Sequence, residues 1–319
     1  MKKVLICRPM PPAVKERAEA LFDVTWRESN APMTEAEMRS SMVLYDGMMP
    51  TLGDNFSKKV FDEFGRPRCK ILANFGVGIN HINLDAARTH GVTVTNTPGA
   101  VTDATADIAM TLLLMSARRA GEGERLARSG TWEGWHPTQM LGSHVTGKTV
   151  GIIGMGRIGQ AIARRCHFGF AMEVLFFNRS ERQVDFPVRQ VGSLRELAEA
   201  CDFLVAATPG GADTTHLVSS DVFAAMKPSA HFVNISRGEV VDEAALITAL
   251  EAGAISGAGL DVYEHEPQIP AGLRALDNAV LLPHLGTNTE EVRTKMGMMA
   301  LDNLDAFFRG ETPPNALNA

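Results

Sequence analysis

The chain has little cysteine, and this scarcity excludes several kinds of protein. Its 319 residues include four cysteines, Cys7, Cys69, Cys166 and Cys201, and none of them forms a Cys-x-x-Cys pair. We therefore interpret them as separate thiols in a reducing cytoplasm rather than as a disulfide framework. No group of His and Cys residues has the spacing of a zinc site, which argues against a metal held by the protein.

The chain also lacks an excess of positive charge and a long apolar run. The formal net charge is −6, so there is no overall positive field that would attract nucleic acid. No apolar run approaches the roughly 18 residues of a membrane span. The short apolar stretch near the N-terminus is broken by Arg8, so we expect a first strand there rather than a signal peptide.

The alternation of apolar and helical segments predicts two α/β domains, and the length of the chain is sufficient for two. In the first hundred residues we expect helices at residues 14–22 and 84–90. The expected strands are residues 3–7, 23–26, 41–45, 70–74 and 92–96. A second such unit begins at Gly147. Its expected strands are residues 149–153, 173–177, 203–206, 230–235, 257–262 and 280–282, which suffice for a full Rossmann sheet.

Three further segments complete the predicted organisation. The helix expected over residues 102–119 is apolar almost all round, so we expect it to be buried between domains or subunits. Trp132 and Trp135 lie amid polar residues and belong either to a partner surface or to a face packed on their own domain. The last helix, expected at about residues 289–308, is predicted to return to the first domain. We therefore place a discontinuous first domain at residues 1–98 plus 287–319, and a second domain at residues 99–286.

A glycine-rich loop in mid-chain is the strongest single motif. Residues 151–159 read GIIGMGRIG, follow an apolar strand and open a helix. In such a loop Gly154 permits the tight turn, Gly156 lets the backbone approach a pyrophosphate, and Gly159 allows close helix–strand packing. The helix N-terminus favours phosphate, and Arg157 adds a positive charge. This context predicts dinucleotide binding.

The end of the following strand predicts which dinucleotide is bound. An acidic residue about 20 positions beyond the loop normally holds the ribose 2′-hydroxyl of NAD. Here the strand ends in Asn178, Arg179 and Ser180, with no carboxylate. Arg179 can pair with a 2′-phosphate, Ser180 can donate to it, and Arg182 can assist. We predict that NADP(H) is preferred and NAD(H) possible, the alternative being that Arg179 is a solvated loop residue.

Charged residues follow three successive strands in the second half of the chain. Arg237 can fork onto a carboxylate, although a strand-end arginine is more often part of a salt bridge. Asp261 is placed to meet the nicotinamide side of the cofactor, and either Glu264 or Glu266 can orient a histidine. His284, paired with a glutamate, can give and take a proton near neutral pH. These groups are what interconversion of a 2-oxo acid and a 2-hydroxy acid requires.

Eight motifs together carry a family resemblance. They are NFGVGIN (residues 74–80), NTPG (96–99), TDATAD (102–107), GMGRIG (154–159), NISRG (234–238), GLDV (259–262), EP (266–267) and PHLG (283–286). Over essentially its full length the chain resembles the D-isomer-specific 2-hydroxyacid dehydrogenases. Within that family it is most similar to the glyoxylate/hydroxypyruvate reductases, by residues 178–180 and by GWHP at residues 134–137.

The resemblance implies the fold and the assembly. It implies two doubly wound parallel-sheet domains, a flavodoxin-like substrate-binding domain and a Rossmann NAD(P)-binding domain. It also implies an interdomain cleft that closes on the substrate and excludes water. A homodimer built on the buried helix and the tryptophan segment is the implied assembly.

The resemblance also implies roles for single residues. Arg237 would hold the substrate carboxylate together with the backbone N–H groups of Val77 and Gly78. Glu266 would be the orienting acid, and His284 would protonate the carbonyl oxygen. The residues implied to line the cofactor are Thr105, Gly154, Met155, Gly156, Arg157, Ile158, Gly159, Asn178, Arg179, Ser180, Thr208, Ile235, Asp261 and Gly286.

We therefore expect NADP(H)-dependent reduction of a small 2-oxo acid, of the glyoxylate/hydroxypyruvate class, to the D-2-hydroxy acid. Residues 48–51 resemble a substrate-side loop, and Met48 and Met49 are expected to enlarge or soften the pocket. One alternative is an NAD-linked D-lactate-type dehydrogenase. A remote alternative is a non-enzymatic nucleotide-sensing repressor, against which the presence of Arg237, Glu266 and His284 argues.

Overall fold

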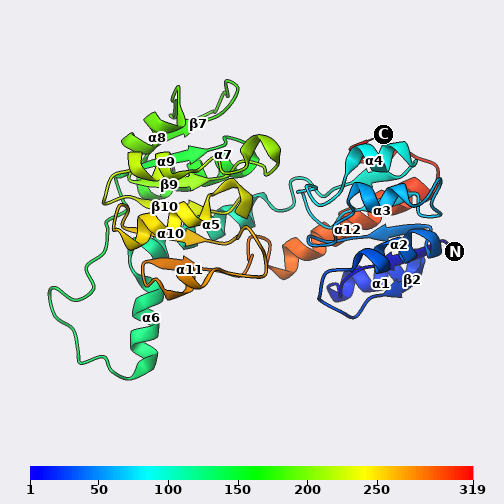
Figure 1. Cartoon of the computed structure of the whole chain (residues 1–319), viewed down its shortest axis with the longest axis horizontal. Helices are drawn as coiled ribbons and strands as arrows, with labels where there is room; N and C mark the ends of the chain where they lie inside the picture. Colours follow the sequence, from blue (N-terminus) through cyan, green and yellow to red (C-terminus); the bar gives the residue numbers. More distant parts are fainter. Residues whose placement is uncertain (319) are drawn as a thin grey trace. The chain divides into compact units, whose positions relative to one another are not determined.

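The computed structural model describes residues 1–318, which divide into two compact units (Figure 1). The first unit comprises Met1–Val101 together with the residues from Asn288 onward, and the second comprises Thr102–Thr287. The chain therefore leaves the first unit once and re-enters it once. Each unit has a parallel sheet of its own.

The first unit is built on a five-stranded parallel sheet of order β2-β1-β3-β4-β5. Its strands are β1 (Lys3–Ile6), β2 (Asp23–Trp26), β3 (Gly47–Met49), β4 (Ile71–Ala73) and β5 (Thr93–Thr95). Its helices are α1 (Pro12–Leu21), α2 (Glu35–Leu44), α3 (Lys58–Asp62), α4 (Leu84–Thr89) and α12 (Glu290–Phe308). This is the flavodoxin-like strand order, as predicted.

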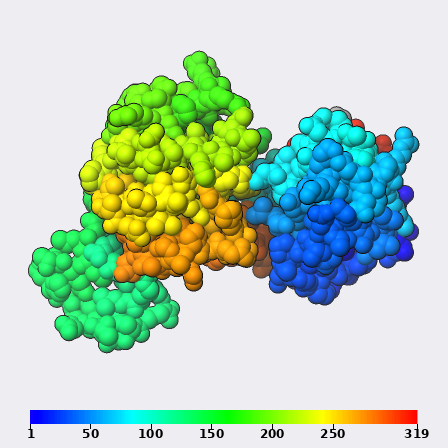
Figure 2. Space-filling model, viewed as in Figure 1, coloured from blue at the N-terminus to red at the C-terminus, as the bar shows by residue number. Residues whose placement is uncertain are grey.

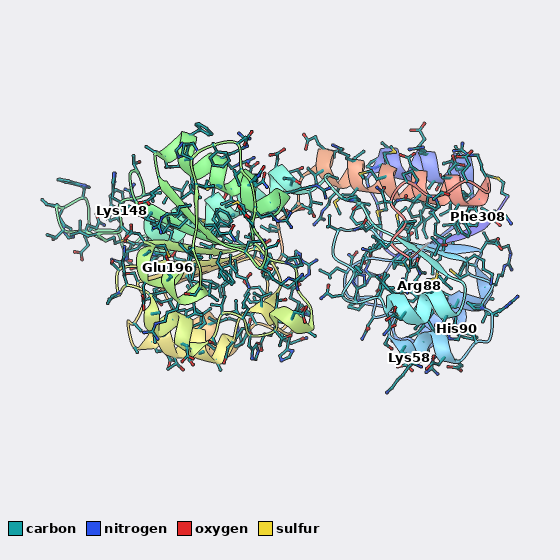
Figure 3. The ribbon with its side chains drawn as sticks, turned by 90° about the horizontal axis from the view of Figure 1, so that it is seen from above. Lys58, Arg88, His90, Lys148, Glu196 and Phe308 are labelled. Carbon is teal, nitrogen blue, oxygen red and sulfur yellow. The ribbon has the colours of Figure 1, made fainter. Side chains whose placement is uncertain are left out.

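Helices cover both faces of the first sheet. In Figure 3, α12 with Phe308 lies on one side of the sheet, whereas Lys58 of α3 and Arg88 of α4 lie on the other. Alternate residues of β1 enter the two cores: Ile6 packs in the cluster that contains α1 and α12, and Leu5 packs in the cluster under α2, α3 and α4. Burial on both faces explains why these strands read as continuous apolar runs.

The strand predicted at residues 41–45 is wrong, because these residues form and follow the last turn of α2. The helix begins with a capping box, in which the Thr34 side chain accepts from the Glu37 N–H and the Glu37 carboxylate accepts from the Thr34 N–H. Met38 and Met42 are buried one turn apart, which is helical spacing. The third strand of the sheet is instead β3.

The expectation that two methionines soften a substrate pocket is also wrong. Met48 and Met49 are both fully buried in β3, where they enter the two opposite cores of the first unit. They are therefore core residues. Leu52, which follows them in the next turn, is the large apolar side chain of this segment that is exposed.

The second unit is built on a seven-stranded parallel sheet of order β12-β11-β10-β9-β6-β7-β8. Its strands are β6 (Thr149–Ile153), β7 (Glu173–Phe177), β8 (Arg189–Gln190), β9 (Phe203–Ala206), β10 (His231–Asn234), β11 (Gly257–Leu260) and β12 (Ala279–Leu281). The six predicted strands are all present, but the Rossmann order is completed by β8, as the third strand, and is extended by β12. The edge strand β8 was not predicted, because two residues leave no periodic pattern in the sequence.

Helices cover both faces of the second sheet as well. The helices of this unit are α5 (Thr102–Ala117), α6 (Ala120–Ser129), α7 (Arg157–Arg164), α8 (Leu194–Ala200), α9 (Ser220–Ala225), α10 (Glu243–Glu251) and α11 (Ala271–Ala275), with a π-helical turn at Arg165–Gly169 and short 3-10 turns at Ala212–Thr214 and Gly238–Val240. The core on one face includes α5 and α7, and the core on the other includes α8, α9 and α10.

The long helix α5 is not apolar all round, contrary to our expectation. Its buried face packs on β10, β11 and α7 within the second unit. Its outer edge carries the exposed residues Asp103, Asp107 and Thr111. Arg165 pairs with Asp103 at 3.2 Å and with Asp107 at 2.8 Å. The burial of α5 therefore follows from packing within one unit and is not evidence for a subunit interface.

The segment that contains the two tryptophans projects from the second unit. No residue of α6 is buried, and the Trp132 and Trp135 side chains that follow it are 55% and 79% exposed. In Figure 2 this segment is the blue-green mass that stands away from the body of its unit. The alternative in which the tryptophans pack on their own domain is therefore wrong. No helix of residues 1–318 is long and apolar enough to cross a membrane.

Candidate active site

The glycine loop has the shape that a pyrophosphate site needs. Gly154 has φ of 97°, and a Cβ on it would lie 2.9 Å from the carbonyl oxygen of Ala207. A Cβ on Gly159 would lie 2.1 Å from the carbonyl oxygen of Gly154, so only glycine lets α7 pack so closely on the loop. Gly156, in contrast, has no heavy atom within 4 Å of its Cβ position. The open side of the loop therefore faces free space at the N-terminus of α7.

The loop lies where the order of the strands reverses. β6, which precedes Gly154, has β7 on one side and β9 on the other, and β9 leads to Thr208. Ligands of open α/β sheets bind outside the carboxyl ends of the strands at such a point. The geometry of this site therefore fits a dinucleotide.

Beyond β7, hydrogen bonds link the strand end to the glycine loop. The Asn178 side chain accepts from the Met155 N–H at 3.3 Å and donates to the Ser180 carbonyl oxygen at 2.8 Å. The Arg179 side chain is 89% exposed and lies 3.4 Å from the Asp213 carboxylate, which is also exposed. Ion pairs of this kind contribute little to stability, so this guanidinium is accessible to an anionic ligand.

Arg237 is held at the end of β10 by a short polar turn. The Asn234 side chain donates to the Arg237 carbonyl oxygen at 3.0 Å and accepts from the Ser236 N–H at 3.0 Å. A Cβ on Gly238 would lie 1.8 Å from the carbonyl carbon of Tyr263, so the turn packs directly on the segment after β11. Burial lowers the pKa of Arg237, against the opposing effect of the nearby carboxylates.

His284 and Glu266 form a hydrogen-bonded pair at the ends of two adjacent strands. Nδ1 of His284 lies 2.8 Å from Oε2 of Glu266, and Oε1 of Glu266 accepts from the Tyr263 N–H at 3.1 Å. Burial raises the pKa of Glu266, but the hydrogen bond and charge of His284 outweigh it, so the net pKa is lowered. Glu266 is therefore a carboxylate at neutral pH, and it accepts a hydrogen bond from the Nδ1–H of the imidazole.

The turn that carries His284 is held by Asp261. The two carboxylate oxygens of Asp261 accept from the N–H groups of Leu285, at 2.6 Å, and Gly286, at 2.8 Å. The Thr105 hydroxyl donates to the Gly286 carbonyl oxygen at 3.1 Å. Burial raises the pKa of Asp261, and the hydrogen bonds from the N–H groups of Leu285 and Gly286 oppose the rise. Asp261 thus shapes the turn that presents His284.

The other candidate glutamate has a different partner. Oε1 of Glu264 lies 2.5 Å from Nε2 of His216, in the loop that follows β9. Of the two glutamates left open by the sequence, the structure therefore brings Glu266 to His284.

In the first unit, Val77 and Gly78 lie in the loop after β4. The buried Asn74 side chain donates to the carbonyl oxygens of Gly76, at 3.1 Å, and Gly78, at 3.0 Å. The Asn96 side chain donates to the Val77 carbonyl oxygen at 3.0 Å. These bonds engage the carbonyl groups of the loop and leave the N–H groups of Val77 and Gly78 to other partners.

The candidate residues of the second unit thus follow neighbouring strands of one sheet. Arg237, Glu266 and His284 follow β10, β11 and β12, which are adjacent and in register at their carboxyl ends. Ile235, also a candidate, is buried directly after β10. Among residues 1–318, no group of three or more His, Cys, Asp or Glu side chains is placed to hold a metal ion.

The family model for the D-isomer specific 2-hydroxyacid dehydrogenase, NAD binding domain, matches residues 110–286. The glyoxylate reductase of Pyrococcus furiosus is 40% identical, over 99% of this chain and 95% of its own length. The chain belongs to the D-isomer specific 2-hydroxyacid dehydrogenase family. The glycerate dehydrogenase of Hyphomicrobium methylovorum is 36% identical, over 99% of both chains.

A solved structure of the same family shows the same fold. The NADPH-dependent glyoxylate/hydroxypyruvate reductase of Sinorhizobium meliloti, in complex with NADP and malonate, superposes with a TM-score of 0.88. It is 34% identical and is matched over 99% of this chain and 96% of its own. This D-2-hydroxyacid dehydrogenase is thus an enzyme, an oxidoreductase that uses a nicotinamide cofactor.

Sequence reasoning missed several residues that shape the site of this dehydrogenase. Asn234 lies inside the NISRG motif, but the motif does not show that its side chain forms the turn before Arg237. Tyr263 donates its hydroxyl to the carbonyl oxygens of Leu260 and Leu282 and thereby links two strand ends. The tyrosine follows Asp261 closely in the sequence, but its partners become neighbours only in the folded sheet.

Proposed function

We propose that this dehydrogenase reduces a small 2-oxo acid of the glyoxylate/hydroxypyruvate class to the D-2-hydroxy acid, with NADPH as the preferred cofactor. The observation that carries the proposal is the His284–Glu266 pair, at 2.8 Å, on strand ends next to that of Arg237. Relatives named glyoxylate reductase and glycerate dehydrogenase support the substrate class.

The proton is assigned to His284. Reduction of a 2-oxo acid adds a hydride to C2 and a proton to the carbonyl oxygen. The nicotinamide cofactor supplies the hydride when it is bound. Because Nδ1 of His284 faces Glu266, Nε2 is the nitrogen that gives the proton, and the ionised Glu266 stabilises the imidazolium before transfer.

The substrate carboxylate is assigned to Arg237 and to backbone N–H groups. Burial makes the guanidinium of Arg237 poorly solvated, so a planar carboxylate that accepts two parallel hydrogen bonds is favoured there. The N–H groups of Val77 and Gly78 in the first unit are proposed to bind the same carboxylate.

The cofactor is assigned to the loop of the second unit and its surroundings. Gly154–Gly159 would hold the pyrophosphate, and Thr105, Thr208, Ile235, Asp261 and Gly286 would line the remainder. Arg179 and Ser180 would bind a 2′-phosphate, which would replace the exposed pair of Arg179 with Asp213. A relative that is NADPH-dependent by name supports this preference.

We also propose a cytoplasmic homodimer. The exposed Trp132 and Trp135 on a projecting segment are suited to a subunit interface. The four buried free cysteines fit a reducing compartment.

Initial rates test the proposal. NADPH and NADH oxidation are measured with glyoxylate, hydroxypyruvate, pyruvate and phenylpyruvate, in the wild type and in Arg179→Ala. We expect fast NADPH oxidation with the first two acids, and about a tenfold rise in the KM for NADPH, but not for NADH, in the variant. A wild-type preference for NADH, or equal effects of the variant on both cofactors, would overturn the preference for NADPH.

A further inference from the structure

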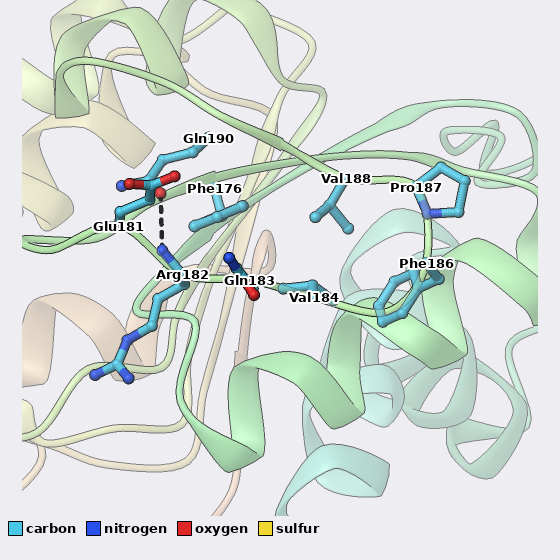
Figure 4. Close-up of a pocket in the computed structure, with 9 residues that line it drawn as sticks. All are labelled: Phe176, Glu181, Arg182, Gln183, Val184, Phe186, Pro187, Val188 and Gln190. Atoms are coloured by element: carbon cyan, nitrogen blue, oxygen red, sulfur yellow. Dashed lines mark hydrogen bonds between the residues drawn. The ribbon is translucent and has the colours of Figure 1, made fainter.

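The side chain of Gln190 lies against the end of β7. Gln190 belongs to the edge strand β8, where it pairs with Phe176 of β7. Its Nε2 donates to the carbonyl oxygens of Asn178, at 3.2 Å, and Ser180, at 3.3 Å, and its Oε1 accepts from the Arg182 N–H at 3.2 Å. Figure 4 shows Gln190 over Glu181 and Arg182, with the last of these bonds dashed. One amide thus engages three backbone groups of this turn.

These partners require an amide at position 190. The carbonyl oxygens of Asn178 and Ser180 can only accept hydrogen bonds, and the Arg182 N–H can only donate. A glutamine donates twice from Nε2 and accepts at Oε1, so it matches all three groups. A glutamate of the same size would place a carboxylate against two carbonyl oxygens, and an apolar side chain would satisfy none of the groups.

Little else fixes the turn at residues 178–180. Arg179 and Ser180 are exposed, and residues 181–188 form a loop without helix or strand. This loop packs Val184, Phe186 and Val188 in or against the core and borders an open hollow of about 660 Å³ (Figure 4). Its far end is held through Phe186, whose ring lies under the guanidinium of Arg164 at 4.9 Å. The backbone that presents Arg179 therefore depends on the hydrogen bonds of Gln190 and Asn178.

We propose that Gln190 is a positioning residue that sets the preference for a cofactor with a 2′-phosphate. It contacts no ligand itself in this assignment; it fixes the turn from which Arg179 and Ser180 reach the phosphate. Asn178 connects the same turn to the glycine loop through the Met155 N–H. The proposal rests on the NADPH preference proposed above and adds a residue from outside the motif that predicted it.

Binding of cofactor fragments tests this proposal without turnover. Titration calorimetry gives the Kd of adenosine 2′,5′-bisphosphate and of adenosine 5′-diphosphate for the wild type and for Gln190→Met. The variant keeps the size and charge of the side chain and removes its donors. We expect about tenfold weaker binding of the 2′,5′-bisphosphate and less than about twofold change for the 5′-diphosphate. With NADPH the KM should rise while kcat is retained.

Two further variants make the result specific. Gln183→Met makes the same chemical change in an exposed residue that lines the same hollow, and it should leave both Kd values unchanged. Gln190→Glu keeps the acceptor but loses the donors, so it should weaken 2′,5′-bisphosphate binding at least as much as Gln190→Met. If Gln190→Met does not fold, the Kd values of Gln190→Glu test the proposal in its place.

The outcomes separate this proposal from the one on which it rests. A wild type that binds the two fragments equally overturns the NADPH preference, and this inference with it. A wild type that prefers the 2′,5′-bisphosphate, with Gln190 variants that retain that preference, overturns this inference alone. Equal weakening of both fragments also overturns it, because that result indicates general damage to the fold.

Discussion

At the scale of single residues, the backbone of His284 distinguishes this site from an ordinary strand end. Its φ of 55° lies in the left-handed region, which residues other than glycine rarely adopt. The turn is held by the His284 N–H, which donates to the Asp261 carbonyl oxygen at 3.0 Å, and by the Asp261 carboxylate. Such a conformation persists where the surroundings fix it, and it is common at functional sites.

Replacement of the proposed proton donor should abolish turnover but spare cofactor binding. In His284→Gln we expect kcat to fall by about 10²- to 10⁴-fold, since the amide cannot deliver a proton. The Kd for NADPH, measured by fluorescence titration, should remain within about twofold. His144→Gln, an exposed histidine of the same unit, is the control. A His284→Gln enzyme with wild-type kcat would remove His284 from this role.

Replacement of the proposed carboxylate clamp should act mainly on substrate affinity. Arg237→Lys keeps the charge but loses the planar fork, so we expect kcat/KM to fall by about 100-fold, largely through KM. Steady-state kinetics with hydroxypyruvate measure this effect. An unchanged KM would show that Arg237 does not contact the substrate.

The residues of the site differ in how far the sequence could predict them. The glycines of the cofactor loop were predictable, because a short local motif specifies the tight turn, the open side and the close packing. The contacts of Gln190, Tyr263 and Asp261 were not, because each joins strand ends that only the folded sheet brings together. Sequence motifs identify the side chains that carry out the chemistry, whereas the groups that position those side chains depend on contacts formed only in the tertiary structure.

At the scale of elements, the buried His231 joins three parts of the second unit. It lies on β10, with Nδ1 at 2.8 Å from the Ser116 hydroxyl of α5 and Nε2 at 2.9 Å from the Ser143 hydroxyl. Ser143 follows the projecting tryptophan segment, and its N–H donates to the Ala117 carbonyl oxygen at 2.7 Å. His231 thus fixes the point at which that segment returns to its unit.

This histidine predicts a dependence of stability on pH. Burial lowers the pKa of His231 from 6.5 to about 4. Between these values the unfolded chain binds the proton more tightly than the folded chain, so the folded state loses stability as the pH falls. From pH 7 to pH 5 we expect the wild type to lose about 2 kcal/mol more unfolding free energy than His231→Gln. Urea unfolding at both pH values measures this, and equal losses would contradict it.

The elements were predictable where one periodicity dominates a segment. All six predicted strands of the second sheet exist, because buried parallel strands are continuous apolar runs. At residues 41–45 the predicted strand was wrong, since Val43 and Leu44 continue an apolar run although both are exposed at the end of α2. The capping residues Thr34 and Glu37 indicate that helix, but this signal lies outside the apolar run at residues 41–45.

At the scale of the whole molecule, each of the two sheets reverses its strand order once. The reversal lies between β1 and β3 in the first unit and between β6 and β9 in the second. The predicted fold class, two doubly wound parallel sheets, is confirmed. The sequence could not decide the environment of the tryptophans, since a polar context is compatible with either packing or projection.

The exposed tryptophans predict the assembly state. We expect the wild type to sediment as a dimer at micromolar concentration, and the double variant Trp132→Ser/Trp135→Ser to dissociate, with a Kd raised at least about 30-fold. Phe168→Ser removes another aromatic side chain of the second unit, 66% exposed but outside the projecting segment, and should leave the dimer intact. Sedimentation velocity distinguishes these results. A double variant that remains a dimer would place the interface elsewhere.

The site at the ends of β10, β11 and β12 is proposed to reduce a 2-oxo acid with D-specificity. The most direct measurement is the configuration of the glycerate formed from hydroxypyruvate and NADPH, by chiral chromatography, in the wild type and in His284→Gln. We predict D-glycerate from the wild type and almost none from the variant. L-glycerate from the wild type, or equal yields from both proteins, would contradict the account.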